Sequence, residues 1–388
     1  MSASVESNRK FNNLTITDKQ HRESKYAGKS TICLNMIVKD ESHIIKQTLT
    51  TLIKYIDFAY WVICDTGSSD NTVDIIETFF QKHQIPGEIH HNKWVDFAHN
   101  RNLALGYAKD KAEYTFIFDA DDDIQGDLVL PRKLTEPSYL LKFAGFGSEY
   151  YRPLLIKSDL DWKWYGVLHE YITTNPMYDG KHLSGDYFIT SGRTGNRNKD
   201  PNKYLKDAKV LESAYNTEKD PNLFTRYSFY CAQSYRDAEH REEALYWYKN
   251  TTKLDTWVEE KYYSYLMAGR LLIELNRPEE ALIQWLHGQA LNVNRSECFY
   301  EIAKYYRSLN NMPMAFSFAL LAKRTQTNSN GLFYEANIHD YLIDYELSLS
   351  AYYVNEIKIG LASCLTIIDK CDIPKYVEQT KINIKYYQ

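Results

Sequence analysis

Residues 114–123 read Tyr-Thr-Phe-Ile-Phe-Asp-Ala-Asp-Asp-Asp, an apolar run that ends in a cluster of aspartates. A short run of aromatic and β-branched residues is typical of a buried β-strand. Four carboxylates crowded at the end of that strand repel one another unless a cation or water separates their charges. The stretch therefore predicts a central strand of a sheet with a polar site at its carboxyl end.

The same alternation of strand and helix patterns begins near residue 31. Residues 31–38 and 60–64 have the pattern of buried strands, and residues 41–55, 71–83 and 100–109 carry apolar side chains near helical spacing. Strands that alternate with helices form a mostly parallel sheet with both faces covered. Ligands of such α/β sheets bind beyond the carboxyl ends of the strands, where the polar clusters of this chain fall.

The sequence changes character after residue 200 and becomes a succession of amphipathic helices. Residues 243–248, 280–285 and 314–319 recur at offsets of 37 and 34, each with Ala at its second position. A period near 34 is typical of tetratricopeptide-type helical hairpins, although the full consensus is not met, and an irregular helical bundle is the alternative. We expect three parts: a flexible tail over 1–28, an α/β domain over 29–200 and a tetratricopeptide-like helical domain over 201–388.

The composition is that of an ordinary soluble protein. Of the 388 residues, 44% are hydrophobic and 25% are charged, and 46 basic residues against 51 acidic ones give a formal charge of −5. That balance exerts no pull toward nucleic acid or anionic lipid, so we expect neither as a partner. The chain shows no run long enough to span a bilayer, no secretory signal and no Cys-x-x-Cys pair, so we expect a cytoplasmic protein in a reduced compartment.

Polar clusters follow three of the predicted strands. Asp40 and Glu41 close the first, although acids at a helix N-terminus need no ligand. Asp65 and Thr66 close the second, where a carboxylate can accept hydrogen bonds from a base or ribose, although turn chemistry alone also explains them. The aspartates of residues 119–123 close the third. Mg²⁺ and Mn²⁺ bind one or two protein carboxylates and complete their shell with phosphate oxygens, so this cluster predicts such a cation, with a surface acidic turn as the alternative.

Four motifs occur in a characteristic order: Asn35–Glu41, Asp65–Asp70, Trp94 with His99–Asn102, and Asp119–Asp122. This series resembles the family 2 inverting glycosyltransferases of the GT-A fold. It is most similar to the branch that carries tetratricopeptide-like repeats behind the catalytic domain, which includes bacterial enzymes that glycosylate peptides. The resemblance implies metal-dependent transfer of a hexosyl or N-acetylhexosaminyl group, with inversion, from a nucleotide donor to a protein, glycan or other acceptor.

The resemblance also assigns roles to single residues. It implies that Asp121, in an Asp-x-Asp arrangement with Asp119, binds the metal that bridges the donor diphosphate, while Asp119 contacts the ribose or the sugar. It implies that five further residues contact the nucleotide donor: Asp40, Glu41, Asp65, Thr66 and Arg101. Many members of the family have a second Asp where this chain has Thr66, which leaves the expected base, uracil, open.

Two downstream segments complete the expected site. Residues 161–170 resemble the segment that brings a His-Glu pair to the metal, so His169 is a candidate metal ligand and Glu170 a candidate base for the acceptor proton, with Asp161 and Asp122 in reserve. Residues 192–199 loosely match the loop that folds over the leaving diphosphate, which makes its arginines candidate donor contacts, Arg193 and Arg197. A structural His-Glu pair and an ordinary basic linker are the alternatives.

Two other functions remain open at this point. The chain could be a scaffold of helical repeats that binds a sugar nucleotide without turnover, although the intact aspartates argue against decay. It could instead be a nucleotidyltransferase or phosphohydrolase, although neither a glycine-rich phosphate loop nor an evident nucleophile is present. Helical repeats present extended concave surfaces, which favours a protein or glycan acceptor, and they also form homodimers.

Overall fold

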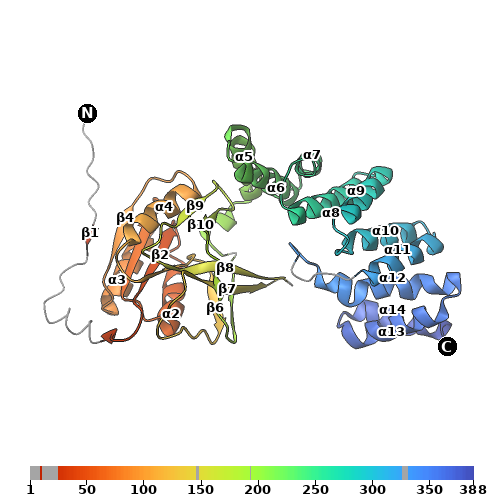
Figure 1. Cartoon of the computed structure of the whole chain (residues 1–388), viewed down its shortest axis with the longest axis horizontal. Helices are drawn as coiled ribbons and strands as arrows, with labels where there is room; N and C mark the ends of the chain where they lie inside the picture. The colour runs from red at the N-terminus through yellow and green to blue at the C-terminus, as the bar shows by residue number, and fades with distance from the viewer. Residues whose placement is uncertain (1–8, 11–24, 146–147, 193, 326–330) are drawn as a thin grey trace. The chain divides into compact units, whose positions relative to one another are not determined.

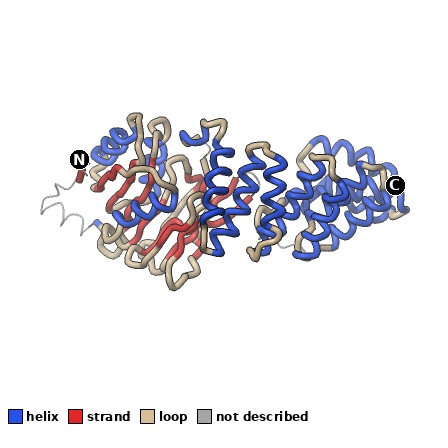
Figure 2. The backbone as a smooth tube through the Cα atoms, turned by 90° about the horizontal axis from the view of Figure 1, so that it is seen from above, coloured by secondary structure: helices blue, strands red, loops and turns tan. Residues whose placement is uncertain are grey.

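The computed structural model describes residues 9–10, 25–145, 148–192, 194–325 and 331–388. The chain divides into two compact units, Met1–Lys203 and Tyr204–Gln388. Strands gather in the first unit, and the described part of the second contains helices and no strand (Figures 1 and 2). The tail expected over residues 1–28 lies mostly outside the described residues.

The first unit is built on a ten-stranded sheet in the order β1-β4-β3-β2-β5-β8-β7-β12-β6, with β11 paired to β7. Its strands are β1 (Arg9–Lys10), β2 (Ile32–Val38), β3 (Tyr60–Asp65), β4 (Gly87–His91), β5 (Tyr114–Ile117), β6 (Asp123–Gly126), β7 (Ser138–Gly145), β8 (Ser148–Lys157), β11 (Lys181–His182) and β12 (Tyr187–Thr190). Strands β4, β3, β2 and β5 run parallel to one another, while β8 is antiparallel to both β5 and β7. The predicted α/β fold class with a mostly parallel sheet is confirmed. The antiparallel part is a finding of the structure.

Helices cover both faces of the parallel strands. They are α2 (Ile45–Tyr55), α3 (Thr72–Lys82) and α4 (Phe97–Ala108). Leu34 and Met36 of β2 pack in the core with residues of α2 and α3, whereas the intervening Asn35 donates from its amide to the carbonyl of Ala104 in α4 at 2.9 Å. This alternation places α2 and α3 on one face and α4 on the other, because successive strand residues point to opposite faces.

The parallel strands bring their carboxyl ends to one edge of the sheet. Val38 of β2 pairs with Asp65 of β3, and Asn35 pairs with Ile117 of β5. Strand β12 returns antiparallel to β6, with Thr190 opposite Asp123, so the segment after β12 starts beside the aspartate cluster. A separate two-stranded sheet follows, made of β9 (Lys163–Tyr165) and β10 (Tyr171–Thr173).

The second unit consists of helical hairpins followed by further helices. The helices are α5 (Lys203–Thr217), α6 (Pro221–Asp237), α7 (Arg241–Thr251), α8 (Val258–Glu274), α9 (Pro278–Leu291), α10 (Glu297–Ser308), α11 (Met312–Arg324), α12 (Ile343–Ser350), α13 (Ile357–Lys370) and α14 (Pro374–Asn383). Helices α6 with α7, α8 with α9, and α10 with α11 pack as hairpins. A membrane-spanning segment is not found among the described helices, each of which is too short or too polar for that role.

The three sequence repeats coincide with the second helix of each hairpin. Their alanines, Ala244, Ala281 and Ala315, are all fully buried, as the close-packed position requires. The turn before each of these helices contains one residue in the left-handed region, and these residues recur at the same offsets as the alanines: Glu239 (φ 62°), Asn276 (φ 57°) and Asn310 (φ 56°). The predicted tetratricopeptide-like repeats are therefore confirmed.

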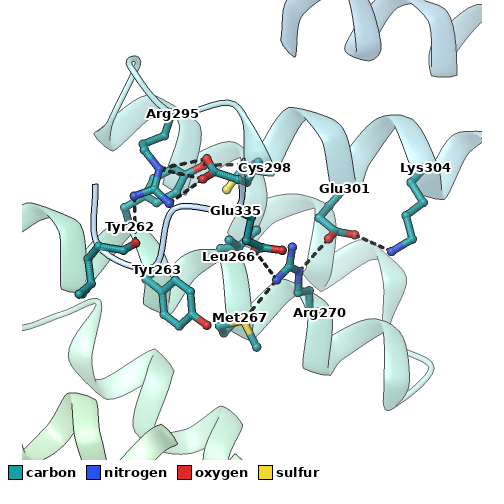
Figure 3. A network of polar contacts seen from close by, with 12 residues as sticks. Tyr262, Tyr263, Leu266, Met267, Arg270, Arg295, Cys298, Glu301, Lys304 and Glu335 are labelled. Carbon is teal, nitrogen blue, oxygen red and sulfur yellow. Dashed lines mark hydrogen bonds and ion pairs between the residues drawn. The ribbon is translucent and has the colours of Figure 1, made fainter. Parts of the chain in front are cut away.

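Partly buried ion pairs tie α8 to α10 and to the segment that precedes α12, and a fully buried pair lies next to them (Figure 3). Arg270 donates to Glu301 at 2.7 Å and to Glu335 at 2.8 Å. Arg295 is 1% exposed and donates through two nitrogens to Glu297, whose side chain is fully buried. Desolvation by itself would raise the pKa of Glu297, but the adjacent His339 and Arg295 outweigh it and hold that pKa far below its usual value. We infer that these pairs specify how neighbouring helices pack, because a purely apolar contact would allow more than one packing arrangement.

Replacing Arg295 with Met should destabilise the helical unit by about 3–5 kcal/mol, because Glu297 would keep its burial and lose the arginine that donates to it, with only His339 left beside it. Amide hydrogen exchange of α8 and α10 in the full chain measures the loss. Arg241→Met is the matched control, because Arg241 also donates to a glutamate, Glu274, but both side chains are about half exposed. Equal effects of the two substitutions would show that burial of the pair does not decide its contribution.

Candidate functional site

The aspartate cluster lies directly after β5, at the carboxyl edge of the parallel strands. Asp122 is 3% exposed, and Asp119 and Asp121 are partly buried. The carbonyl of Ala120, between them, accepts a hydrogen bond from the Thr48 hydroxyl of α2 at 2.6 Å, which fixes the loop to the helix below it. The predicted position of the cluster at a sheet end is thus what the structure shows.

A buried arginine connects Asp119 to Glu170. Arg101 of α4 is 6% exposed, and its guanidinium donates to Asp119 at 2.7 Å and to Glu170 at 2.6 Å, while it stacks over the Trp164 ring at 5.0 Å. Burial on its own would raise the pKa of Asp119, but the charges of Arg101 and Arg152 outweigh it and lower that pKa. One guanidinium therefore brings together two carboxylates from segments far apart in the sequence.

The loop after β12 closes the other side of the cluster through its backbone. The Gly195 N–H donates to the carboxylate of Asp121 at 3.2 Å, and the Asn196 N–H donates to the carboxylate of Glu41 at 3.2 Å. The Gly192 N–H donates to Asp122 at 3.3 Å. Gly192 has no room for a side chain, because a Cβ atom there would lie 1.6 Å from the Asp121 carbonyl oxygen.

Three carboxylates of this site resist ionisation. Burial raises the pKa of Glu41, and the charge of Asp121 raises it further. The hydrogen bond from the Asn196 N–H lowers this pKa, but by less than burial raises it. Burial and then the charge of Asp119 raise the pKa of Asp121. The same two causes raise the pKa of Asp122 to about 7. Several carboxylates with raised pKa values at the mouth of a sheet mark a place where a cation or a proton donor completes the charge balance.

The second predicted cluster is an ordered turn next to this site. Asp65 is 3% exposed and its carboxylate accepts from the N–H groups of Gly67 and Ser68 at 3.1–3.2 Å. His91 of β4 lies 3.2 Å from the same carboxylate. The Thr66 hydroxyl donates to the carbonyl of Val38 at 3.1 Å. Asp65 and Thr66 therefore hold the β2 and β3 loops in place.

Asp40, the other residue of the first cluster that was expected to contact the nucleotide, links the loop after β2 to the loop after β3. Asp40, with φ at 55°, accepts from both the N–H and the hydroxyl of Ser69, at 2.6 and 3.0 Å. Its own N–H donates to the Ser68 hydroxyl at 2.9 Å. Asp40, Glu41, Asp65 and Thr66 thus belong to one hydrogen-bonded edge beside the aspartates.

The other predicted residues that the structure describes are exposed. Asp161 is 89% exposed in its side chain and pairs with Lys109 at 3.2 Å, away from the contacts of the cluster. His169 is exposed, with φ at 53°. Arg197 is exposed and its guanidinium lies 5.1 Å from the Phe97 ring of α4. Arg193 falls outside the described residues.

Three residues of the site were not anticipated from the sequence. Arg152 of β8 lies 3.7 Å from Oδ2 of Asp119, whereas Arg101 contacts Oδ1. His91 contacts Asp65, and Asn196 contacts Glu41 across 155 residues of sequence. The pair of histidines at the end of β4 was the available signal for His91, whereas nothing local marks Arg152 or Asn196.

Among the described residues, no three His, Cys, Asp or Glu side chains gather closely enough to hold a metal ion by themselves. Glu41 and Asp121, which share the Gly195–Asn196 loop, offer hard oxygen atoms at a partly open place. Hard divalent cations are often held by only one or two carboxylates, with phosphate and water oxygens for the rest. The residues present therefore fit such an ion when a phosphorylated ligand accompanies it.

Part of the first unit is similar to known proteins. The profile of Glycosyl transferase family 2 matches residues 33–134. The SPbeta prophage-derived glycosyltransferase SunS of Bacillus subtilis (strain 168) is 37% identical over 93 residues, which are 24% of this chain and 20% of that protein. Glycosyltransferase SunS of Bacillus phage SPbeta matches with the same figures. The match spans about a fifth of the length of these curated relatives.

Solved structures similar to parts of the chain fall into two groups. The C-terminal part of a TPR repeat-containing protein from Cytophaga hutchinsonii covers 44% of this chain and 61% of its own, with 16% identity and a TM-score of 0.35. GalNAc-T7 with UDP, GalNAc and Mn²⁺ covers 25% of this chain and 19% of its own, with 14% identity and a TM-score of 0.23.

Gly192→Ala should release the loop of residues 194–199 from the aspartates, because the new Cβ cannot fit against the Asp121 carbonyl. Loss of two or three hydrogen bonds of about 1 kcal/mol each should raise the open population at least tenfold. Trypsin should then cleave faster after Arg197 and Lys199. Gly106→Ala in α4 is the control, since a Cβ there meets nothing within 4 Å. Unchanged cleavage of the Gly192 variant would show that the backbone contacts do not hold the loop.

Proposed function

We propose that this chain, in which residues 33–134 match Glycosyl transferase family 2, moves a hexosyl or N-acetylhexosaminyl group from a nucleoside diphosphate sugar to a protein or glycan acceptor and releases the nucleoside diphosphate. The observation that carries the proposal is the joint position of Asp121, Glu41 and Asp122 at the carboxyl edge of the parallel strands under a glycine-containing loop. A sugar nucleotide has a diphosphate that needs a cation and a polar edge at this place.

The nucleoside part of the donor would lie beside the β2 and β3 loops. Asp40 and Asp65 order the turn of residues 67–69 through its N–H groups, which gives that edge a fixed shape. A preorganised edge binds a flat base with little loss of conformational entropy. We propose uracil as the base and UDP as the released product.

A divalent cation, Mn²⁺ or Mg²⁺, would be held by Asp121 together with donor phosphate oxygens. Such an ion supplies positive charge that stabilises the leaving diphosphate. The loop N–H groups of Gly195 and Asn196, which now meet Asp121 and Glu41, point at the same place. Arg197, which stacks on Phe97, is the proposed arginine contact of the leaving group in the described part of the loop.

Transfer with inversion is a single displacement at the anomeric carbon. The bond from that carbon to the phosphate oxygen breaks as the acceptor oxygen forms its own bond, and the acceptor proton passes to a carboxylate. We propose Glu170 as that base, oriented by the hydrogen bond from Arg101 at 2.6 Å. Asp122, with a pKa of about 7, is the alternative because its proton affinity suits proton transfer near neutral pH.

Asp121→Asn should reduce Mn²⁺-dependent release of UDP from the best UDP-sugar by roughly 100-fold or more, because the cation would lose its charged protein ligand. The assay is donor hydrolysis with Mn²⁺ present, after nucleotide sugars have been screened by thermal shift with and without Mn²⁺. Asp123→Asn is the control from the same run of aspartates, since its carboxylate bonds only to Gln125 among described side chains. Wild-type turnover in the Asp121 variant would refute the metal assignment, and release of pyrophosphate would indicate a nucleotidyltransferase.

Glu170→Gln should keep donor binding and lose roughly 100-fold or more of transfer, because the amide can still accept from Arg101 but cannot take a proton. Calorimetry with UDP and Mn²⁺ measures the binding, and product formation with acceptor measures the transfer. Asp161→Asn serves as the control on the exposed side of the same segment. Loss of transfer in Asp122→Asn but not in Glu170→Gln would assign the base to Asp122 instead.

A further inference from the structure

The β7–β8 hairpin carries a continuous aromatic and cationic face that leads to the aspartate cluster. Phe143 pairs with Tyr150 and Leu141 pairs with Arg152 across the two strands. The rings of Phe143 and Tyr150 stack at 5.2 Å, and the Arg152 guanidinium lies 5.1 Å from the Phe143 ring. Because side chains alternate between faces along a strand, Tyr150 and Arg152 share one face, and Lys142 and Tyr151 belong to the other.

Two arginines approach Asp119 and differ in how their donors are used. Arg101 has a side chain 7% exposed and spends two nitrogens on hydrogen bonds to carboxylates. Arg152 has a side chain 29% exposed and lies 3.7 Å from Asp119, an ion-pair distance beyond hydrogen bonding. Within the described part of the chain its guanidinium makes no hydrogen bond. Its N–H donors are therefore available to a ligand at the same carboxylate that Arg101 fixes.

The charge at this place argues against an anion as that ligand. Arg152 lies beside Asp119, and the negative charges of Asp119, Asp121 and Asp122 already exceed the positive ones here, since Arg101 is shared with Glu170. A further phosphate group bound at Arg152 would be repelled by this excess of negative charge. A neutral ring with several hydroxyl groups suits it better, because hydroxyls accept from the guanidinium, donate to Asp119 and leave apolar C–H groups for an aromatic ring such as Tyr150, which is 45% exposed.

We propose that Arg152 binds hydroxyl groups of the sugar that is transferred, and that it thereby helps to select among nucleotide sugars. This inference rests on the proposed function. It assigns the β8 side of Asp119 to the pyranose ring and leaves the diphosphate to Asp121 and the loop of residues 194–199. Arg101 is then a positioning residue, because it holds Asp119 in place beside both the pyranose ring and the diphosphate.

The test separates the sugar from the nucleotide in the full chain. The variants are Arg152→Met, which keeps the stem on Phe143, and Arg152→Lys, which keeps the charge and loses the fork. UDP binding with Mn²⁺ is measured by calorimetry, and KM and kcat are measured for hydrolysis of UDP-glucose, UDP-galactose and their N-acetylhexosamine counterparts. Lys142→Met is the control, a cation from the opposite face of the same hairpin. Thermal unfolding shows that the variants fold.

We expect Arg152→Met to bind UDP like the wild type and to raise KM for the preferred UDP-sugar roughly ten- to hundredfold, with a smaller rise for Arg152→Lys. In Arg152→Met the differences in KM among the four UDP-sugars should become smaller. Lys142→Met should give the KM values of the wild type. Equal weakening of UDP and UDP-sugar would assign Arg152 to the diphosphate. That result, or unchanged UDP binding and KM, overturns the inference.

The same experiment distinguishes failure of the inference from failure of the proposed function. Hydrolysis of a UDP-sugar by the wild type, with Arg152 variants indistinguishable from it, leaves the glycosyltransferase and removes the role of Arg152. A wild-type chain that neither binds UDP nor hydrolyses any of the four UDP-sugars overturns both.

Discussion

The burial of several carboxylates side by side at one edge of the sheet is the constraint on which the candidate site depends. Parallel strands β2, β3 and β5 end at one edge, and that edge receives Glu41, Asp65 and the aspartates after β5. The chain compensates part of this charge with Arg101, which is buried between Asp119 and Glu170, and part with N–H groups of the loop after β12. Burial, together with the negative charge that is left uncompensated, raises the pKa values of Glu41, Asp121 and Asp122. A cation that arrives with a diphosphate would complete the balance.

The second unit depends on a different principle. Each helical hairpin buries an alanine where its two helices approach most closely, and neighbouring hairpins are joined by ion pairs such as Arg270 with Glu301. Repeats of this kind contact mainly their neighbours, so the unit can lengthen or vary without disturbing the sheet.

Sequence reasoning succeeded where the signal is local. The strands that became β2, β3 and β5 are continuous apolar runs, and the aspartates follow one of them directly, so their common edge follows from parallel topology. The buried alanines and their turns were visible for the same reason. Reasoning from sequence did not find Arg152, whose place depends on antiparallel pairing of β7 with β8 and β5, nor the contact between Glu41 and Asn196 across 155 residues. Such pairings arise from tertiary packing and leave no periodic pattern near the residue itself.

The central claim is that the aspartates after β5 share a divalent cation with the diphosphate of a sugar nucleotide. A crystal of the full chain soaked with UDP and Mn²⁺, with anomalous diffraction recorded to locate manganese, tests it most directly. The account predicts a manganese peak within coordination distance of the Asp121 carboxylate and of both phosphates, with uracil against the loops that follow β2 and β3. Manganese and UDP bound elsewhere, or Asp121 facing solvent beside an empty edge, would contradict it.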